Sequence, residues 1–202
     1  MERRELLKMI ALLTGGVMIG GNALLVGCSP GKRKSKNAID FTQEEVDFLN
    51  EVSETILPAT KSPGAKAAKV GAFMTVMVND CYEDKDQKAF YAGIGQLDAA
   101  CKKMHGSGFL KATPAQRLSL LVNLDQEAKE YQSKKGGLEE AERKKNKDFA
   151  GLPNHYFTMM KQLTMLGYFT SEAGCTQALR YIAVPGRFDG TVPYKKGDKA
   201  WA

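Results

Sequence analysis

The chain has 202 residues, with 29 Lys and Arg against 23 Asp and Glu, which gives a formal net charge of +6. Residues 28–202, which follow an N-terminal leader, suffice for one domain with a hydrophobic core. The positive charge does not make nucleic acid an expected partner, because an exported protein encounters little of it.

The first 27 residues have the features of an export signal. Arg3 and Arg4 precede an apolar run with no charged residue between Lys8 and Lys32. This pattern resembles the twin-arginine signal of bacteria, which exports folded proteins. Glycines interrupt the run and make it poorly suited to spanning a membrane, so it indicates a removable leader. An uncleaved membrane anchor is the alternative.

The leader ends in a lipoprotein-like motif. Residues 25–28, "LVGC", resemble the lipobox in which the cysteine, here Cys28, is acylated and becomes the new N-terminus. Each buried methylene contributes about 0.8 kcal/mol, so several acyl chains anchor a protein firmly. Residues 28–40 are then a tether whose basic residues contact anionic lipid headgroups. We expect the mature protein on the periplasmic side of the envelope, attached to the inner or the outer membrane.

From residue 41 onward, apolar residues recur at helical spacing. A capping box of Thr42 and Glu45 begins the first predicted helix, which ends before Pro58. The segment 60–67 predicts a turn, and an apolar stripe from Val70 to Cys81 predicts the second helix.

Further helical segments follow. The fourth is capped by Thr113 and Gln116 and has an indistinct end near Tyr131. The charged run 138–147 indicates either an exposed helix face or a mobile linker. The predicted segments cover about 86–105, 114–131 and 154–167, with a shorter helical piece at 172–180.

The last twenty residues differ from the rest, because their prolines and glycines favour turns and extended chain. No segment shows the clear alternation of a strand. The sequence therefore predicts an all-α domain over residues 41–202, with about five helices around one core and an irregular C-terminal tail.

Few residues indicate chemistry. A glycine-rich nucleotide-binding turn is absent, and Gly93 and Gly95 lie within a predicted helix, where they indicate close helix packing. Cys101 and His105 are four residues apart, but two ligands do not make a metal site. His155 stands near a helix start, where capping or a surface contact is favoured over catalysis. The sequence predicts no catalytic, cofactor-binding or metal-binding residue in this chain.

Three cysteines remain if Cys28 is acylated. Cys81 and Cys101 lie on apolar helical faces and either pair with each other or stay buried as thiols. Cys175 lies in a less regular segment, where it either joins a partner chain or stays a free buried thiol.

Three stretches carry a family resemblance. They are "FTQEEVDFLNEVSETILPATKSPGAKAAKVGAFM", "LTMLGYFTSEAGCTQALRY" and "VPGRFDG", and they resemble the gluconate 2-dehydrogenase subunit 3 family over about residues 41–201. The resemblance implies a small helical, non-catalytic partner of a large flavoprotein of the glucose–methanol–choline type, which carries FAD and oxidises a sugar or sugar acid. A cytochrome c often accepts the electrons. The lipobox and the charged stretch 131–154 depart from the family pattern.

Together these features predict an accessory subunit. Arg3 and Arg4 would export a folded flavoprotein that lacks a signal of its own, and the lipid on Cys28 would hold the complex at a membrane. Aromatic residues and arginine are the usual anchors of interfaces. The predicted interface residues are Leu166, Gly167, Tyr168, Phe169, Cys175, Arg187, Phe188, Tyr194 and Trp201.

Other interpretations remain open. The same residues could instead pack the tail onto the helices. The chain could also be a stand-alone helical lipoprotein that binds a ligand or a cell-envelope component. An enzyme with Cys175 as nucleophile fits poorly, because no histidine lies near it in sequence.

Overall fold

The computed structural model describes Glu5, residues 38–184 and residues 186–201. The chain divides into two units, residues 1–34 and residues 35–202, and the helices α2–α6 belong to the second. Arg3, Arg4 and Cys28 lie outside the described residues, so the export signal and the lipid anchor stay predictions. No described helix combines the length and hydrophobicity needed to cross a membrane.

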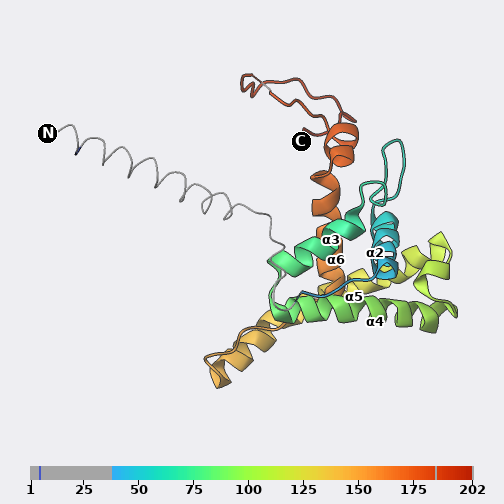
Figure 1. The fold of residues 1–202 in the computed structure, drawn as a ribbon, viewed down its shortest axis with the longest axis vertical. Helices are drawn as coiled ribbons and strands as arrows, with labels where there is room; N and C mark the ends of the chain where they lie inside the picture. The colour runs from blue at the N-terminus through green and yellow to red at the C-terminus, as the bar shows by residue number, and fades with distance from the viewer. Residues whose placement is uncertain (1–4, 6–37, 185, 202) are drawn as a thin grey trace. The chain divides into compact units, whose positions relative to one another are not determined.

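The predicted all-α fold is confirmed (Figure 1). The described residues contain five α-helices and no regular strand; a single β-bridge joins Arg180 and Trp201. The helices are α2 (Gln43–Ile56), α3 (Val70–Cys81), α4 (Asp84–His105), α5 (Pro114–Lys145) and α6 (Tyr156–Phe169), with a 3₁₀ turn η1 (Phe109–Lys111) and a π-helical turn η2 (Gly174–Ala178).

The predicted caps set the helix boundaries. Thr42 Oγ1 accepts the N–H of Glu45 at 3.2 Å, and Glu45 Oε2 accepts the N–H of Thr42 at 2.8 Å. Thr113 and Gln116 form the same capping box at the start of α5. α4 ends at Gly106, whose φ of +75° is costly for any residue with a Cβ. Local sequence thus fixes where these helices begin and end.

Helix α6 forms the centre of the domain. It packs against α2, α3, α4 and α5. Tyr156 and Phe157 at its start and Gly167 and Tyr168 near its end are buried. A helix that is apolar on most sides is stable only when neighbours surround it. The fully buried side chains of the core come from α6 and the elements around it, and they include Phe90, Phe109, Phe157, Met74, Leu97 and Met160.

Helix α5 extends past Tyr131, where the sequence left its end indistinct, and continues to Lys145. Ion pairs at helical spacing support this extension: Lys135 lies 3.8 Å from Glu139, and Lys144 lies 2.8 Å from Glu140. Each such pair stabilises a solvated helix by about 0.2–0.5 kcal/mol. Of the two interpretations of the charged run 138–147, the exposed helix is confirmed.

The three described cysteines are free, so the alternative of a Cys81–Cys101 disulfide is not realised. Cys101 is a buried thiol, as one interpretation predicted, and burial raises its pKa. The expectation of burial was wrong for Cys81, which is exposed at the last residue of α3.

Two neighbouring glycines of α4 allow a matched test of packing. An added Cβ on Gly93 would lie 2.4 Å from Cβ of Tyr156, whereas an added Cβ on Gly95 would meet nothing within 4 Å. The predicted close packing therefore holds for Gly93 alone. We expect Gly93→Ala to destabilise the protein by about 1–3 kcal/mol through overpacking. Gly95→Ala should stabilise it by about 0.5–1 kcal/mol through reduced chain entropy.

Urea denaturation of both variants measures these changes. Equal effects of the two substitutions would contradict the packing of α4 against α6.

Candidate functional site

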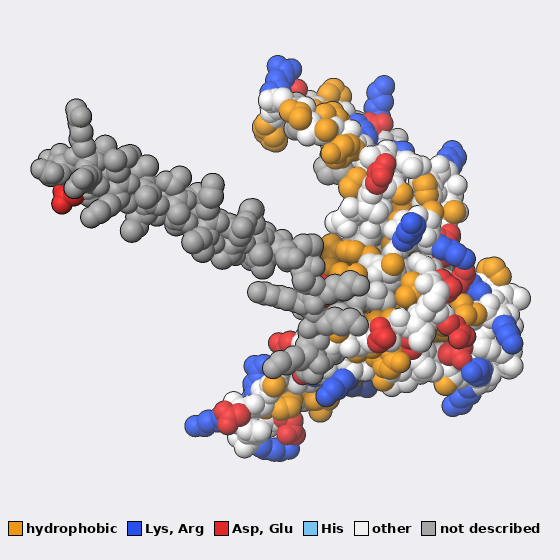
Figure 2. Space-filling view, viewed as in Figure 1, with side chains coloured by type: hydrophobic (Ala, Val, Ile, Leu, Met, Phe, Trp, Pro, Cys, Tyr) orange, Lys and Arg blue, Asp and Glu red, His pale blue; other side chains and the backbone are white. Residues whose placement is uncertain are grey.

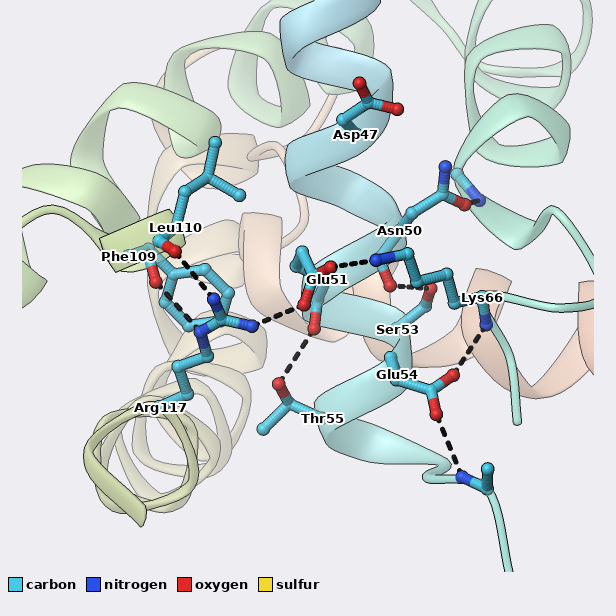
Figure 3. A network of polar contacts seen from close by, with 12 residues as sticks. Asp47, Asn50, Glu51, Ser53, Glu54, Thr55, Lys66, Phe109, Leu110 and Arg117 are labelled. Carbon is cyan, nitrogen blue, oxygen red and sulfur yellow. Dashed lines mark hydrogen bonds and ion pairs between the residues drawn. The ribbon is translucent and has the colours of Figure 1, made fainter. Parts of the chain in front are cut away.

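The most connected polar cluster centres on Glu51 of α2 (Figure 3). Its carboxylate pairs with Lys66 and with Arg117 of α5. Arg117 also donates from Nε to the Phe109 carbonyl at 2.9 Å and from Nη2 to the Leu110 carbonyl at 2.8 Å. Its guanidinium lies 5.3 Å from the centre of the Phe109 ring.

This cluster joins α2 to α5 and to the loop after α2. The hydrogen bond from Lys66 lowers the pKa of Glu51 most, burial opposes this decrease, and Arg117 lowers the pKa further. Because the net pKa lies below its ordinary value, the carboxylate is not poised as a base near neutral pH. Glu54 accepts the backbone N–H groups of Ala59 and Lys66 and so closes the loop after α2. Within the described ranges, no group of three or more His, Cys, Asp or Glu could hold a metal ion.

His155 caps α6, which is one of the two roles that the sequence favoured. Its Nδ1 accepts the N–H of Phe157 at 3.3 Å, and its ring stacks on Tyr156 with the ring centres 4.6 Å apart. Tyr131 lies on another side, at 5.7 Å, and Glu127 Oε1 lies 3.8 Å from Nε2. Burial lowers the pKa of His155 below its ordinary value, and Glu127 opposes part of that decrease.

This cap predicts a pH dependence of stability. The pKa of His155 is lower in the folded than in the unfolded protein, so the unfolded state binds the proton more tightly. The stabilising contribution is fully present above the unfolded pKa and is lost as the pH falls from there through the lower folded pKa. We expect the contribution of the neutral His155 side chain to be lost over that window.

His155→Asn is the matched variant, because asparagine can cap a helix without titrating. Urea denaturation at pH 7 and pH 5 should show a larger loss of unfolding free energy for the unmodified protein than for His155→Asn. Equal losses of unfolding free energy in the unmodified protein and in His155→Asn would show that His155 does not act as a titrating cap.

The predicted interface residues of α6 divide into two groups. Leu166 is exposed, but Gly167 and Tyr168 are buried within this chain. An added Cβ on Gly167 would lie 2.6 Å from the Phe73 ring, and the Tyr168 hydroxyl donates to the Pro63 carbonyl at 2.6 Å. Gly167 and Tyr168 are therefore core residues and supply no free surface. Phe169 is half-buried against the same core.

Cys175 is half-buried in η2. Its Sγ donates to the Phe169 carbonyl at 3.0 Å, and its backbone N–H donates to the Ser171 carbonyl at 2.9 Å. The thiol is engaged at the end of α6, and it remains a prediction that it contacts a partner.

The remaining predicted residues lie in an exposed segment that we name the C-terminal loop, residues 181–201. Phe188 is 96% exposed, Tyr194 is 72% exposed and Trp201 is 49% exposed, while Arg187 is also exposed. Tyr181, Ile182, Val184 and Val192 are exposed as well. Figure 2 shows hydrophobic side chains gathered on this loop, which continues from the end of α6 in Figure 1.

The loop is closed at its base by Arg180. Its backbone N–H donates to the Ala200 carbonyl at 2.8 Å, and its guanidinium lies 4.5 Å from the centre of the Trp201 ring. Lys199 also donates to the Gln177 carbonyl of η2. A cation–π contact of this kind contributes about 0.5–1 kcal/mol at an exposed site. No sequence pattern indicates this role of Arg180, since its pairing depends on how the loop closes.

Inside the loop lies an open hollow of about 640 Å³, lined by Ile182, Gly186, Arg187, Phe188, Asp189, Val192 and Trp201. Asp189 fixes one rim by accepting the N–H and the hydroxyl of Thr191 at 3.0 and 2.8 Å. Monomeric proteins rarely expose so many large apolar residues together, and such patches usually mark interaction sites. The arrangement suits the binding of another protein surface.

Comparison with known families gives one result. The family model described as gluconate 2-dehydrogenase subunit 3 matches residues 43–186, which include the helices α2–α6 and η2. The chain matches no curated protein and no solved structure.

Proposed function

This chain belongs to the gluconate 2-dehydrogenase subunit 3 family, and we propose on that basis that it is the non-catalytic small subunit of a dehydrogenase complex. The catalytic partner would be an FAD-containing flavoprotein of the glucose–methanol–choline type that oxidises a sugar or sugar acid. A cytochrome c could then accept its electrons. This chain would export the flavoprotein, stabilise it and hold it at a membrane.

The exposed C-terminal loop is the observation that carries this proposal. Arg180 fixes the base of the loop. Part of the entropy cost of ordering the loop's aromatic residues is therefore met before a partner binds. Phe188 and Tyr194 contact little of their own domain, although aromatic residues of this size gain most from burial. Interface anchors have these properties, with the exposed Leu166 of α6 as a further candidate.

The export role rests on the leader. If the flavoprotein folds around its cofactor in the cytoplasm, the twin-arginine route is the one that accepts it as folded cargo. The pair Arg3 and Arg4 would thus serve the partner, since no cofactor is expected in this chain. Acylation of Cys28 would retain the complex at the membrane after the leader is removed.

The anchor can be tested by metabolic labelling with a palmitate analogue. We expect the unmodified protein to be labelled and found with membranes, and Cys28→Ala to be unlabelled. Cys175→Ala is the matched control and should be labelled normally. Equal labelling of Cys28→Ala would refute acylation at this cysteine.

A further inference from the structure

Positive charge gathers on the C-terminal loop and its base. Residues 180–201 carry five basic and two acidic residues, whereas residues 38–179 carry 17 basic and 19 acidic residues. Figure 2 shows basic side chains beside the hydrophobic ones on this loop. The helices thus have a slight excess of negative charge, and the loop has the opposite sign. The five basic residues are Arg180, Arg187, Lys195, Lys196 and Lys199.

These basic side chains lack acidic partners among the described residues. The ten ion pairs that the structure records there all lie between residues 51 and 161. Lys199 donates instead to the Gln177 carbonyl, and the Arg180 guanidinium lies over the Trp201 ring. The other three basic side chains are exposed. The described carboxylates of this chain therefore do not pair with the positive charge of the loop.

The two acidic residues of the loop have local partners. Asp189 accepts the N–H and the hydroxyl of Thr191, and Asp198 Oδ2 accepts the backbone N–H of Lys195 at 3.0 Å. Both carboxylates thus hold turns of the loop together. They reduce its net positive charge without reversing the sign.

Basic and apolar residues meet at the hollow of the loop. Arg187 lines this hollow together with Phe188 and Trp201. Its volume of about 640 Å³ leaves room for a large apolar side chain. At protein interfaces an apolar centre excludes water and supplies most of the affinity, while charges around it set specificity and the rate of association.

The shape of the loop favours a protein partner over a lipid surface. Arg180 joins Trp201 through a β-bridge and donates its N–H to the Ala200 carbonyl, so the two ends of the loop are held together. A hollow closed in this way gains contacts only from a group that projects into it. A segment that enters a bilayer instead buries an apolar face among acyl chains and needs no hollow.

We propose that the C-terminal loop recognises an acidic surface of the dehydrogenase. An apolar side chain of the partner enters the hollow, and carboxylates around it face Arg187, Lys195 and Lys196. This inference rests on the proposed function, because it specifies the partner surface that the same loop binds. Exposed charges of this kind accelerate association more than they strengthen the final complex.

Binding kinetics at two salt concentrations test the role of charge. The full chain is immobilised in mild detergent, and the probe is the flavoprotein subunit that co-purifies with it from membranes, identified by its flavin absorption. We expect the association rate constant to fall at least about fivefold between about 50 and about 300 mM NaCl, because salt screens exposed charges.

Two matched pairs of lysines separate the loop from the helices. Lys195→Gln/Lys196→Gln should lower the association rate constant at about 50 mM NaCl at least about threefold and weaken its salt dependence. Lys88→Gln/Lys103→Gln removes the same charge from α4 and should leave both quantities unchanged. All four lysines are exposed, so both variants should fold normally.

The outcomes distinguish this inference from the proposed function. Equal rate constants for the two lysine variants, or a rate constant that salt does not change, would overturn the acidic surface and leave the proposed function standing. If no flavoprotein co-purifies with the unmodified chain or binds to it, the proposed function fails, and this inference fails with it.

Trp201 is the single tryptophan of the chain, so its fluorescence reports on other partners of the loop. Phosphatidylglycerol vesicles should leave its emission maximum unchanged. A blue shift that Lys195→Gln/Lys196→Gln abolishes would show that the loop meets a bilayer, and it would overturn the proposal. Self-association in sedimentation velocity that the same variant abolishes would assign the loop to a second copy of this chain, which would also overturn it.

Discussion

Replacing Arg3 and Arg4 by lysines should leave the flavoprotein in the cytoplasm and reduce periplasmic dehydrogenase activity to the background of a strain without this chain. Lysine keeps the positive charge but lacks the planar fork of donors that guanidinium presents, so a site built for arginine rejects it. The expected loss of periplasmic activity is large because a single export signal would serve both proteins.

Fractionation of cells followed by a dye-linked dehydrogenase assay measures this effect. Lys8→Arg is the matched control, because it changes a basic residue of the same leader without touching the pair. We expect Lys8→Arg to export normally. Normal periplasmic activity with both arginines replaced would refute the escort role.

Truncating two aromatic residues of the C-terminal loop should release the dehydrogenase from this chain. Phe188 and Tyr194 are the most exposed aromatic side chains of the loop. Truncating an interface anchor to alanine reduces the binding free energy by at least about 2 kcal/mol, which raises the Kd roughly thirtyfold. Because both side chains are exposed, Phe188→Ala/Tyr194→Ala should change the stability of the isolated chain by less than about 0.5 kcal/mol.

A pull-down of the dehydrogenase with tagged variants measures the loss of binding. Val76→Ala is the matched control, since Val76 is an exposed apolar residue of α3 outside the loop. Deletion of residues 185–202 should have the strongest effect. Retention of the dehydrogenase by the deletion variant would show that the loop is not the docking surface.

A third variant separates contact from preorganisation. Arg180 closes the base of the loop without being one of its exposed aromatic residues. Arg180→Ala keeps Phe188 and Tyr194 in place in the sequence. If the loop must be preformed, this variant should retain less dehydrogenase in the same pull-down than the unmodified protein.

Local signals in the sequence account for most of the helix boundaries. Thr42 and Thr113 cap their helices because their hydroxyl groups satisfy backbone N–H groups that otherwise lack partners. Gly106 ends α4 because it accepts a positive φ. The end of α5 lacked such a signal, since its last turns depend on ion pairs between exposed residues.

The candidate site was only partly predictable from sequence. Apolar residues recur all around α6, so periodicity could not tell that Gly167 and Tyr168 face the core while Leu166 faces outward. The pairing of Arg180 with Trp201 joins the two ends of an irregular loop, and no local pattern encodes loop closure. The sequence left open whether Phe188 and Tyr194 pack onto the helices or face outward, and the structure shows both side chains exposed.

We propose that this chain is an accessory subunit of a flavin-dependent dehydrogenase. Purification of the native protein from membranes under mild detergent tests it most directly. We expect a larger yellow subunit to co-purify, with a flavin absorption spectrum and sugar or sugar-acid dehydrogenase activity. A monomer without bound flavoprotein would contradict the account and support a stand-alone helical lipoprotein.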